Sequence, residues 1–179
     1  GVPLYIEEIT KAVVEHLRGS DPQAGKPELI IPPTLQELLL SRLDRLANAK
    51  PIAQLASCLG VEFPGELLFA LRGGDAGLGD MLEVLVRAEI MIRHGVGKSA
   101  RFSFRHSLFQ EIAYNALLRG QRRANHEQIA RLITASYPDL AEKNPEILAR
   151  HCAAGGMPEQ AIQCWRQASH LAYSSSGFV

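Results

Sequence analysis

Two different spacings of apolar residues follow one another in the middle of the chain. Over residues 78–86 the apolar positions recur every three or four residues, which is the repeat of an amphipathic helix. The spacing then falls to two, with Ile90 and Ile92 in one run and Phe102 and Phe104 in the next, as in half-buried strands. A helical pattern resumes beyond Phe104. The pattern therefore predicts a helix, two short strands and a second helix.

A glycine-containing connection separates the two strand patterns. Gly95-Val96-Gly97-Lys98 suits the tight turn of a β-hairpin. Together with Ser99 it resembles the end of a phosphate-binding P-loop, but that motif requires glycine five positions before Gly97, where the chain has Ile92. A P-loop also opens a helix, whereas a strand pattern follows here. We therefore predict a hairpin turn.

The helix after the second strand carries a start signal. Ser107 and Gln110 have the S-x-x-Q spacing of a capping box, in which two side chains bond free backbone N–H groups. His106 precedes this helix, where an imidazole can donate a hydrogen bond to an anion that the helix dipole also favours. A histidine here can equally serve as a structural tie between strand and helix, and the pattern alone leaves both interpretations open.

Two further helices are predicted before these elements. Residues 48–59 place apolar side chains at i, i+3, i+4 and i+7, and Gly60 follows as a stop signal. A shorter helix is predicted to begin at Phe63-Pro64 and to end at Gly73-Gly74. Three helices followed by a hairpin make up a winged-helix domain, which we place at residues 48–118.

The segments on both sides are also predicted to be helical. Residues 1–47 contain a helix over residues 4–17, a loop rich in proline and glycine over residues 20–33, and a helix opened by Thr34 and Glu37 as a T-x-x-E capping box. The predicted fold is thus mainly α. It comprises a helical lid, a winged helix with one small β-hairpin, and an α-helical repeat region.

The repeat region is placed at residues 119–179. Its helical patterns cover residues 121–136, 144–154 and 158–174. The last two are similar to one helix pair of a tetratricopeptide-like repeat, and a single pair cannot bury its own apolar face. Small side chains are expected at their contact: Ala153, Ala154, Ala161 and Ala168. We expect a junction in the polar run at residues 118–123, which Gly120 interrupts, and we expect trypsin to cut there first.

Composition narrows the class of protein. The 179 residues are 46% apolar, enough for a packed core, and 19 basic residues balance 19 acidic ones. Because DNA-binding domains are usually basic, this balance counts against nucleic acid as the main partner. No apolar run reaches the length of a membrane span, and three scattered cysteines suit a reducing cytosol, so we predict a cytoplasmic protein without membrane contact. The start at Gly1, without an initiating methionine, predicts a piece of a larger protein.

No group of residues has the spacing of a catalytic or metal site. Cys58, Cys152, Cys164 and His151 lack the short paired spacings of metal ligands. Neither a G-x-S-x-G nor an H-E-x-x-H motif occurs. We therefore predict that the chain is not an enzyme and holds no metal or cofactor of its own.

DNA binding is the alternative that a winged helix raises. The region of the hairpin is rich in basic residues: Arg93, His94, Lys98, Arg101 and Arg105. The helix that would enter the major groove carries Arg87 but also three acidic residues, Asp80, Glu83 and Glu89. Their carboxylates would repel phosphates. This mixed charge favours a solvated or protein-contacting face, so a DNA-binding transcription factor is the second hypothesis.

Several short segments, in one order along nearly the whole chain, resemble those of a known class. Residues 104–114, FRHSLFQEIAY, resemble a segment of large signal-transduction ATPases, the STAND class. Residues 1–8 and 33–46 resemble segments of the bacterial branch in which the ATPase is joined to a class III adenylate/guanylate cyclase or to a LuxR-type DNA-binding domain. Residues 56–63 resemble a helix end of that branch, and residues 151–168 resemble its tetratricopeptide-like region.

The resemblance implies a regulatory, non-catalytic fragment that couples nucleotide state to an effector output. It implies a P-loop ATPase domain upstream, further helical repeats downstream, ATP or ADP with Mg in the intact protein, and oligomerisation on activation. Gly1 and Pro3 would belong to the nucleotide contact, with Pro3 near the adenine. His106 would reach the β-phosphate of ADP and hold the closed state. Many members of the class have aspartate after this histidine, where this chain has Ser107.

Overall fold

The computed structural model describes residues 35–46, 48–74, 77–97 and 100–175, together with Ile6 and Thr10. Within these ranges the chain is mainly helical and includes one small antiparallel sheet. The loop predicted at residues 20–33, Thr34 of the predicted capping box, and all of the predicted helix at residues 4–17 except Ile6 and Thr10 lie outside the described residues.

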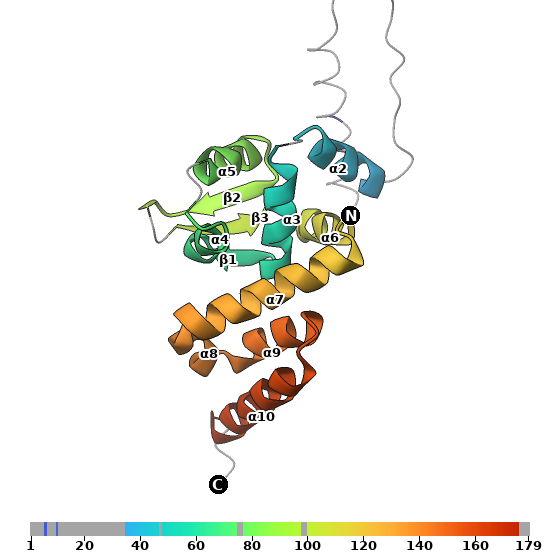
Figure 1. Ribbon diagram of the computed structural model, residues 1–179. Helices are drawn as coiled ribbons and strands as arrows, with labels where there is room; N and C mark the ends of the chain where they lie inside the picture. The colour runs from blue at the N-terminus through green and yellow to red at the C-terminus, as the bar shows by residue number, and fades with distance from the viewer. Residues whose placement is uncertain are drawn as a thin grey trace, which may run out of the picture.

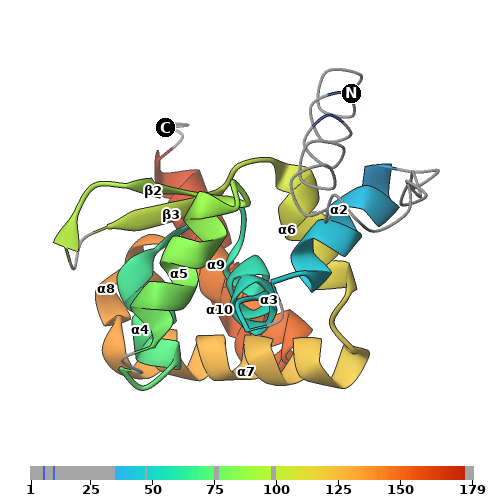
Figure 2. The ribbon, with the colours of Figure 1, turned by 90° about the horizontal axis from the view of Figure 1, so that it is seen from above.

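Three helices and a sheet form one unit, called the sheet unit below. It consists of α3 (Lys50–Leu59), β1 (Glu62–Pro64), α4 (Gly65–Leu71), α5 (Leu78–Arg87), β2 (Met91–His94) and β3 (Arg101–Phe104). The strands form one antiparallel sheet in the order β1-β3-β2. Figures 1 and 2 show the tip of the β2–β3 hairpin at the end of this unit away from α2 (Leu35–Asp44). The predicted three helices and hairpin are confirmed.

The first strand was not predicted. The sequence places a helix start at Phe63-Pro64, whereas these residues belong to β1 and the helix begins at Gly65. Phe63 pairs with Phe102 across the sheet, and its buried ring lies 6.2 Å from that of Phe102 and 6.4 Å from that of Phe104 between centroids. A strand of three residues is too short to show an alternating pattern, so only its long-range pairing reveals it.

The buried face of β2 also differs from the prediction. Met91 is buried within the strand, Ile92 is half-buried, and buried Ile90 precedes the strand. Three apolar residues in succession fit either phase of a two-residue repeat, so the pattern could not choose the inward one. In β3, Phe102 and Phe104 are buried as predicted.

Two helices pack together beside the sheet unit. They are α2 and α6 (Ser107–Asn115). Leu38, Leu39 and Leu43 of α2 are buried in the core. Arg42 donates from Nη2 to the Ala88 carbonyl oxygen at 2.6 Å, at the end of α5. The helix predicted to belong to the lid therefore packs on the residues predicted as a winged helix.

The remaining helices form layers below the sheet unit, as Figure 1 shows. They are α7 (Arg119–Ser136), α8 (Pro138–Lys143), α9 (Pro145–Ala154) and α10 (Pro158–Ser175). α7 packs on α3 and α4 on one side and on α9 on the other, with Ile129, Ala130 and Ile133 buried. The three predicted helices are confirmed within a few residues, and the short α8 was not predicted.

The predicted junction lies in a helix. Residues 119–123 form the first turns of α7, where Arg122 donates to the Leu117 and Asn115 carbonyl oxygens at 3.0 Å each. One hydrophobic core continues from the sheet unit into α7 and α9. The polar run is therefore a helix start held by its arginine rather than an open linker.

Antiparallel packing of α9 and α10 follows the predicted helix pair. Ala161 of α10 and Cys152 of α9 are buried in the same apolar cluster. Ala153 and Ala154 are exposed, so these two alanines are not the small contacts that the sequence predicts.

Candidate functional site at the start of α6

His106 lies between β3 and α6 and is the N-cap residue of that helix, with an extended backbone at φ −134° and ψ 140°. The predicted capping box is not formed, because no side chain caps α6 and exposed Ser107 is already its first helical residue. Gln110 instead donates to the Ser57 carbonyl oxygen at 2.8 Å and joins α6 to α3.

The side chain of His106 has an unusual hydrogen-bonding state. Its Nε2 atom is buried and has no hydrogen-bond partner, which is true of no other buried side-chain nitrogen or oxygen in the part of the chain that the structure describes. The imidazole packs against the buried ring of Phe109, with 6.4 Å between centroids. The Arg42 guanidinium carbon lies 5.8 Å from the centre of the same ring. Phe109 thus positions His106 and anchors a cation from α2.

An unpaired buried nitrogen is costly and therefore informative. Leaving a buried polar group without a partner costs about 1–3 kcal/mol, so folded proteins contain few such groups. The free N–H groups at a helix start favour negative charge beside them. An imidazole nitrogen at the start of α6 is thus suited to bind an anion.

The nearby hollow between α2 and α6 is less suited to an anion. It has a volume of about 430 Å³. Its lining comprises Gln36, Glu37, Leu40, Glu111, Ile112, Asn115 and Ala116. The carboxylates of Glu37 and Glu111 would repel a phosphate, so the start of α6 is the better candidate site. Gly1 and Pro3, the other predicted nucleotide contacts, lie outside the described residues.

The connection that resembles a P-loop joins two strands. Gly95 and Gly97 follow β2 with φ of +81° and +71°, and β3 comes next, as predicted for a hairpin turn. Lys98 and Ser99 lie outside the described residues. The next α-helix or strand that the structure describes after the glycines is β3, whereas a P-loop leads into an α-helix whose start holds the phosphate.

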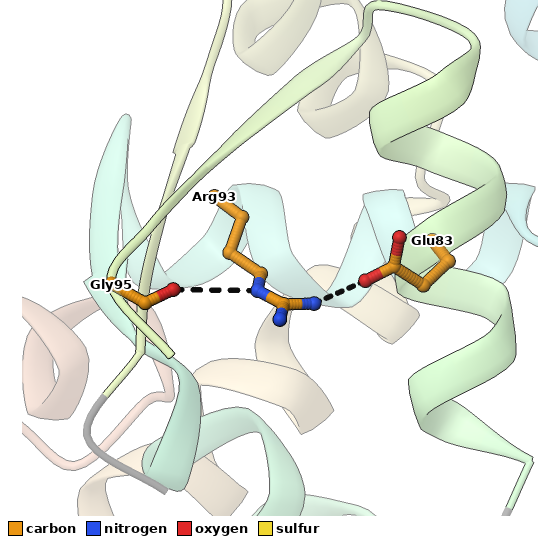
Figure 3. A network of polar contacts seen from close by, with 3 residues as sticks. All are labelled: Glu83, Arg93 and Gly95. Carbon is orange, nitrogen blue, oxygen red and sulfur yellow. Dashed lines mark hydrogen bonds and ion pairs between the residues drawn. The ribbon is translucent and has the colours of Figure 1, made fainter. Parts of the chain in front are cut away.

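Acidic groups pair with two of the cations near the hairpin. Figure 3 shows Arg93 between Glu83 of α5, with which it forms an ion pair, and the Gly95 carbonyl oxygen, to which it donates at 3.4 Å. Arg101 pairs with Glu62 at 2.8 Å. This pairing lowers the positive charge that the hairpin would present to DNA.

A buried polar chain joins three helices and was missed in the sequence. Tyr114 Oη lies 3.0 Å from His126 Nε2, and His126 Nδ1 lies 2.9 Å from His151 Nδ1. Burial lowers the pKa of His126, and burial together with the neighbouring His126 lowers the pKa of His151 to about 3. Both rings are therefore neutral at pH 7, with one Nδ1 donating to the other. The residues are far apart in sequence, so no local pattern could predict the contact.

Neither a metal-binding cluster nor a membrane-spanning helix occurs among the described residues. No group of three or more histidine, cysteine, aspartate or glutamate side chains there is arranged to hold a metal ion. None of the helices that the structure describes combines the length and apolar character needed to cross a membrane.

Comparison with known proteins gives one distant relative. The whole chain matches an uncharacterized protein of Rhizobium meliloti (strain 1021) with 28% identity over 184 residues. The chain spans 18% of the length of that relative. No family model matches the chain. No solved structure matches it either.

Proposed function

We propose that this chain is a regulatory, non-catalytic part of a multidomain signal-transduction ATPase of the STAND class, linked to a cyclase or to a transcription regulator. Its role is to couple the nucleotide state of the intact protein to an effector output. The observation that carries the proposal is the buried, unpartnered Nε2 of His106 at the start of α6.

The partner of His106 is the β-phosphate of ADP bound to a P-loop domain of the same protein. A phosphate oxygen would satisfy Nε2 and lie near the free N–H groups of α6. Hydrogen bonds to charged groups contribute about 1.5–3 kcal/mol, enough to favour a closed, ADP-bound arrangement. ATP and an input signal shift the protein towards an open, oligomerising state.

This chain supplies only part of the nucleotide site. Gly1 and Pro3 contribute contacts near the adenine, and the phosphate cradle and Mg come from the upstream ATPase domain. Alone, the chain is expected neither to hydrolyse ATP nor to bind ADP tightly. Micromolar affinity requires about 8 kcal/mol, whereas one hydrogen bond to a charged group contributes about 1.5–3 kcal/mol. We place the intact protein in the cytoplasm.

The last helix, α10, serves as the docking surface for further repeats. Four large apolar side chains are exposed on α10: Ile162, Trp165, Leu171 and Tyr173. Stacking of another helix pair would bury them, as in repeat proteins whose units share one core. A ligand or partner bound by these repeats would supply the input signal.

DNA binding is the less favoured function. The ion pairs of Arg93 with Glu83 and of Arg101 with Glu62 weaken the phosphate-binding potential of the hairpin. A gel-shift titration with random duplex at low salt should show no tight binding. Tight binding with a steep salt dependence would favour the DNA-binding hypothesis instead.

ADP release from the intact protein tests the proposal. His106→Ala should speed release by about 10- to 100-fold, because it removes one charge-assisted hydrogen bond. His94→Ala is a matched control, since His94 is exposed and bonds Ser103 Oγ at 2.8 Å on the hairpin. An unchanged release rate in His106→Ala would return His106 to a structural role between strand and helix.

A further inference from the structure

Two cysteines on neighbouring helices take no part in the proposed nucleotide contact. Cys152 of α9 is 2% exposed, and Cys164 of α10 is half-buried. Both are free thiols. They belong to one apolar cluster at the packed contact of the two helices, and their side chains interact directly.

The turn between the helices fixes Cys152 close to the start of α10. Met157 N–H donates to the Cys152 carbonyl oxygen at 2.8 Å, Gly156 N–H donates to Ala153 at 3.3 Å, and Gly156 has φ +79°. These are the bonds of a Schellman motif, which ends a helix and sets the direction of the next segment. The residue before α10 is therefore held against the backbone of Cys152.

Cys164 lies on the face of α10 that packs against α9. Met157, Ala161 and Cys164 are spaced at i, i+4 and i+7 and so lie along one face of the helix. Ala161 is buried where α10 packs on α9. Small residues at a helix contact let the two backbones approach, which a disulfide between helices requires.

We propose that Cys152 and Cys164 form an oxidation site that reacts with a low-molecular-weight disulfide and closes into one intramolecular disulfide joining α9 to α10. In the first step the Cys164 thiolate attacks the oxidant, a mixed disulfide forms, and one thiol leaves. In the second step Cys152 attacks the Cys164 sulfur and releases the other thiol. Two protein thiols are thereby oxidised while one oxidant disulfide is reduced to two thiols.

Exposure decides the order of the two steps. Cys164 is the more accessible thiol and meets the oxidant first. Burial raises the pKa of Cys152 to about 11, and Cys164 contributes to the same shift. Cys152 is therefore a poor first nucleophile, but it is held beside the mixed disulfide and can resolve it.

The third cysteine provides an internal control. Cys58 is buried in α3, where its thiol donates to the Gln54 carbonyl oxygen and accepts from Asn125 Nδ2, both at 3.7 Å. Burial raises its pKa as well. Cys58 should stay reduced under conditions that oxidise the other two.

The test is equilibration of the folded chain with mixtures of glutathione and glutathione disulfide, followed by acid quench, alkylation and peptide mass mapping. We expect a mass decrease of two hydrogens, one Cys152–Cys164 linkage, and alkylated Cys58. The Cys58→Ser variant should give the same linkage. Half-oxidation should need about tenfold less oxidant in the folded chain than in urea, because the fold holds the thiols together.

Three results would contradict the proposed oxidation site. They are three free thiols in the folded chain, glutathione that stays attached to Cys164, and equal oxidant requirements with and without urea. The last result would mean that proximity in sequence, rather than the contact of α9 with α10, drives the pairing. Nucleotide is absent from this experiment, so its outcome is independent of the role of His106.

Discussion

At the scale of single residues, sequence and structure contribute different parts of the candidate site. The position of His106 between a strand pattern and a helix pattern could be predicted from the sequence. That its Nε2 atom lacks a partner could not be predicted. This state depends on packing against Phe109 and on the neighbouring elements supplying no hydrogen-bond partner. The contact between His126 and His151 was missed for the same reason, since it joins residues on separate helices.

Replacing His106 separates a binding role from a structural one. His106→Leu should raise the free energy of unfolding of the isolated chain by about 1 kcal/mol, because it removes a buried nitrogen that lacks a partner. Urea unfolding measures this change, with His94→Leu as the exposed control. A loss of stability greater than about 1 kcal/mol would identify His106 as a structural tie.

The buried histidine pair predicts an acid-sensitive fold. The pKa of His151 is about 3 when folded and about 6.5 when unfolded, so between these values only the unfolded chain binds the proton. Stability should therefore be complete above pH 6.5 and fall as pH drops towards 3, by up to about 1.4 kcal/mol per pH unit.

Urea unfolding between pH 4 and 8 measures this slope. His151→Phe should flatten it, whereas His170→Ala, which removes an exposed histidine of α10, should leave it unchanged. An equal slope in the wild-type chain and His151→Phe would contradict the assignment.

At the scale of helices and strands, long patterns were predicted well and short ones were not. The apolar stripes of α3, α5 and α7 and the alternation of β3 are strong local signals, and each was predicted correctly. β1 and α8 span 3 and 6 residues, which is too short for a repeat to emerge. β1 exists because Phe63 pairs with Phe102, a contact that local sequence does not encode.

Gly65 gives a test of the missed strand. Its N–H donates to the Ala100 carbonyl oxygen at 2.9 Å, and an added Cβ would lie 2.8 Å from that oxygen and 2.9 Å from the Phe102 ring. Gly65→Ala should therefore lower the free energy of unfolding by about 1–3 kcal/mol. Gly120→Ala is the control, since a Cβ there meets nothing within 4 Å and should stabilise α7 by up to about 1 kcal/mol. Equal effects of the two changes would argue against close packing of α4 on β3.

At the scale of the whole molecule, one core joins the predicted winged helix to the helices that follow. α7 contributes to both sides of this core, and Arg122 closes its first turn onto α6. Trypsin should consequently cut after Arg122 and Arg123 only slowly in the folded chain, which reverses the expectation drawn from the polar run alone. Timed digestion with mass mapping checks this prediction. Early cleavage after Arg122 or Arg123 would support an open linker between two separate units.

We propose above all that His106 meets a phosphate of bound nucleotide in the intact protein. A structure of the intact protein with ADP and Mg tests it most directly. We expect His106 Nε2 to lie about 2.7–3.2 Å from a β-phosphate oxygen, with the start of α6 facing the same group. If nucleotide is bound while His106 Nε2 is still unpaired, or is paired only within the protein, His106 is not a phosphate contact.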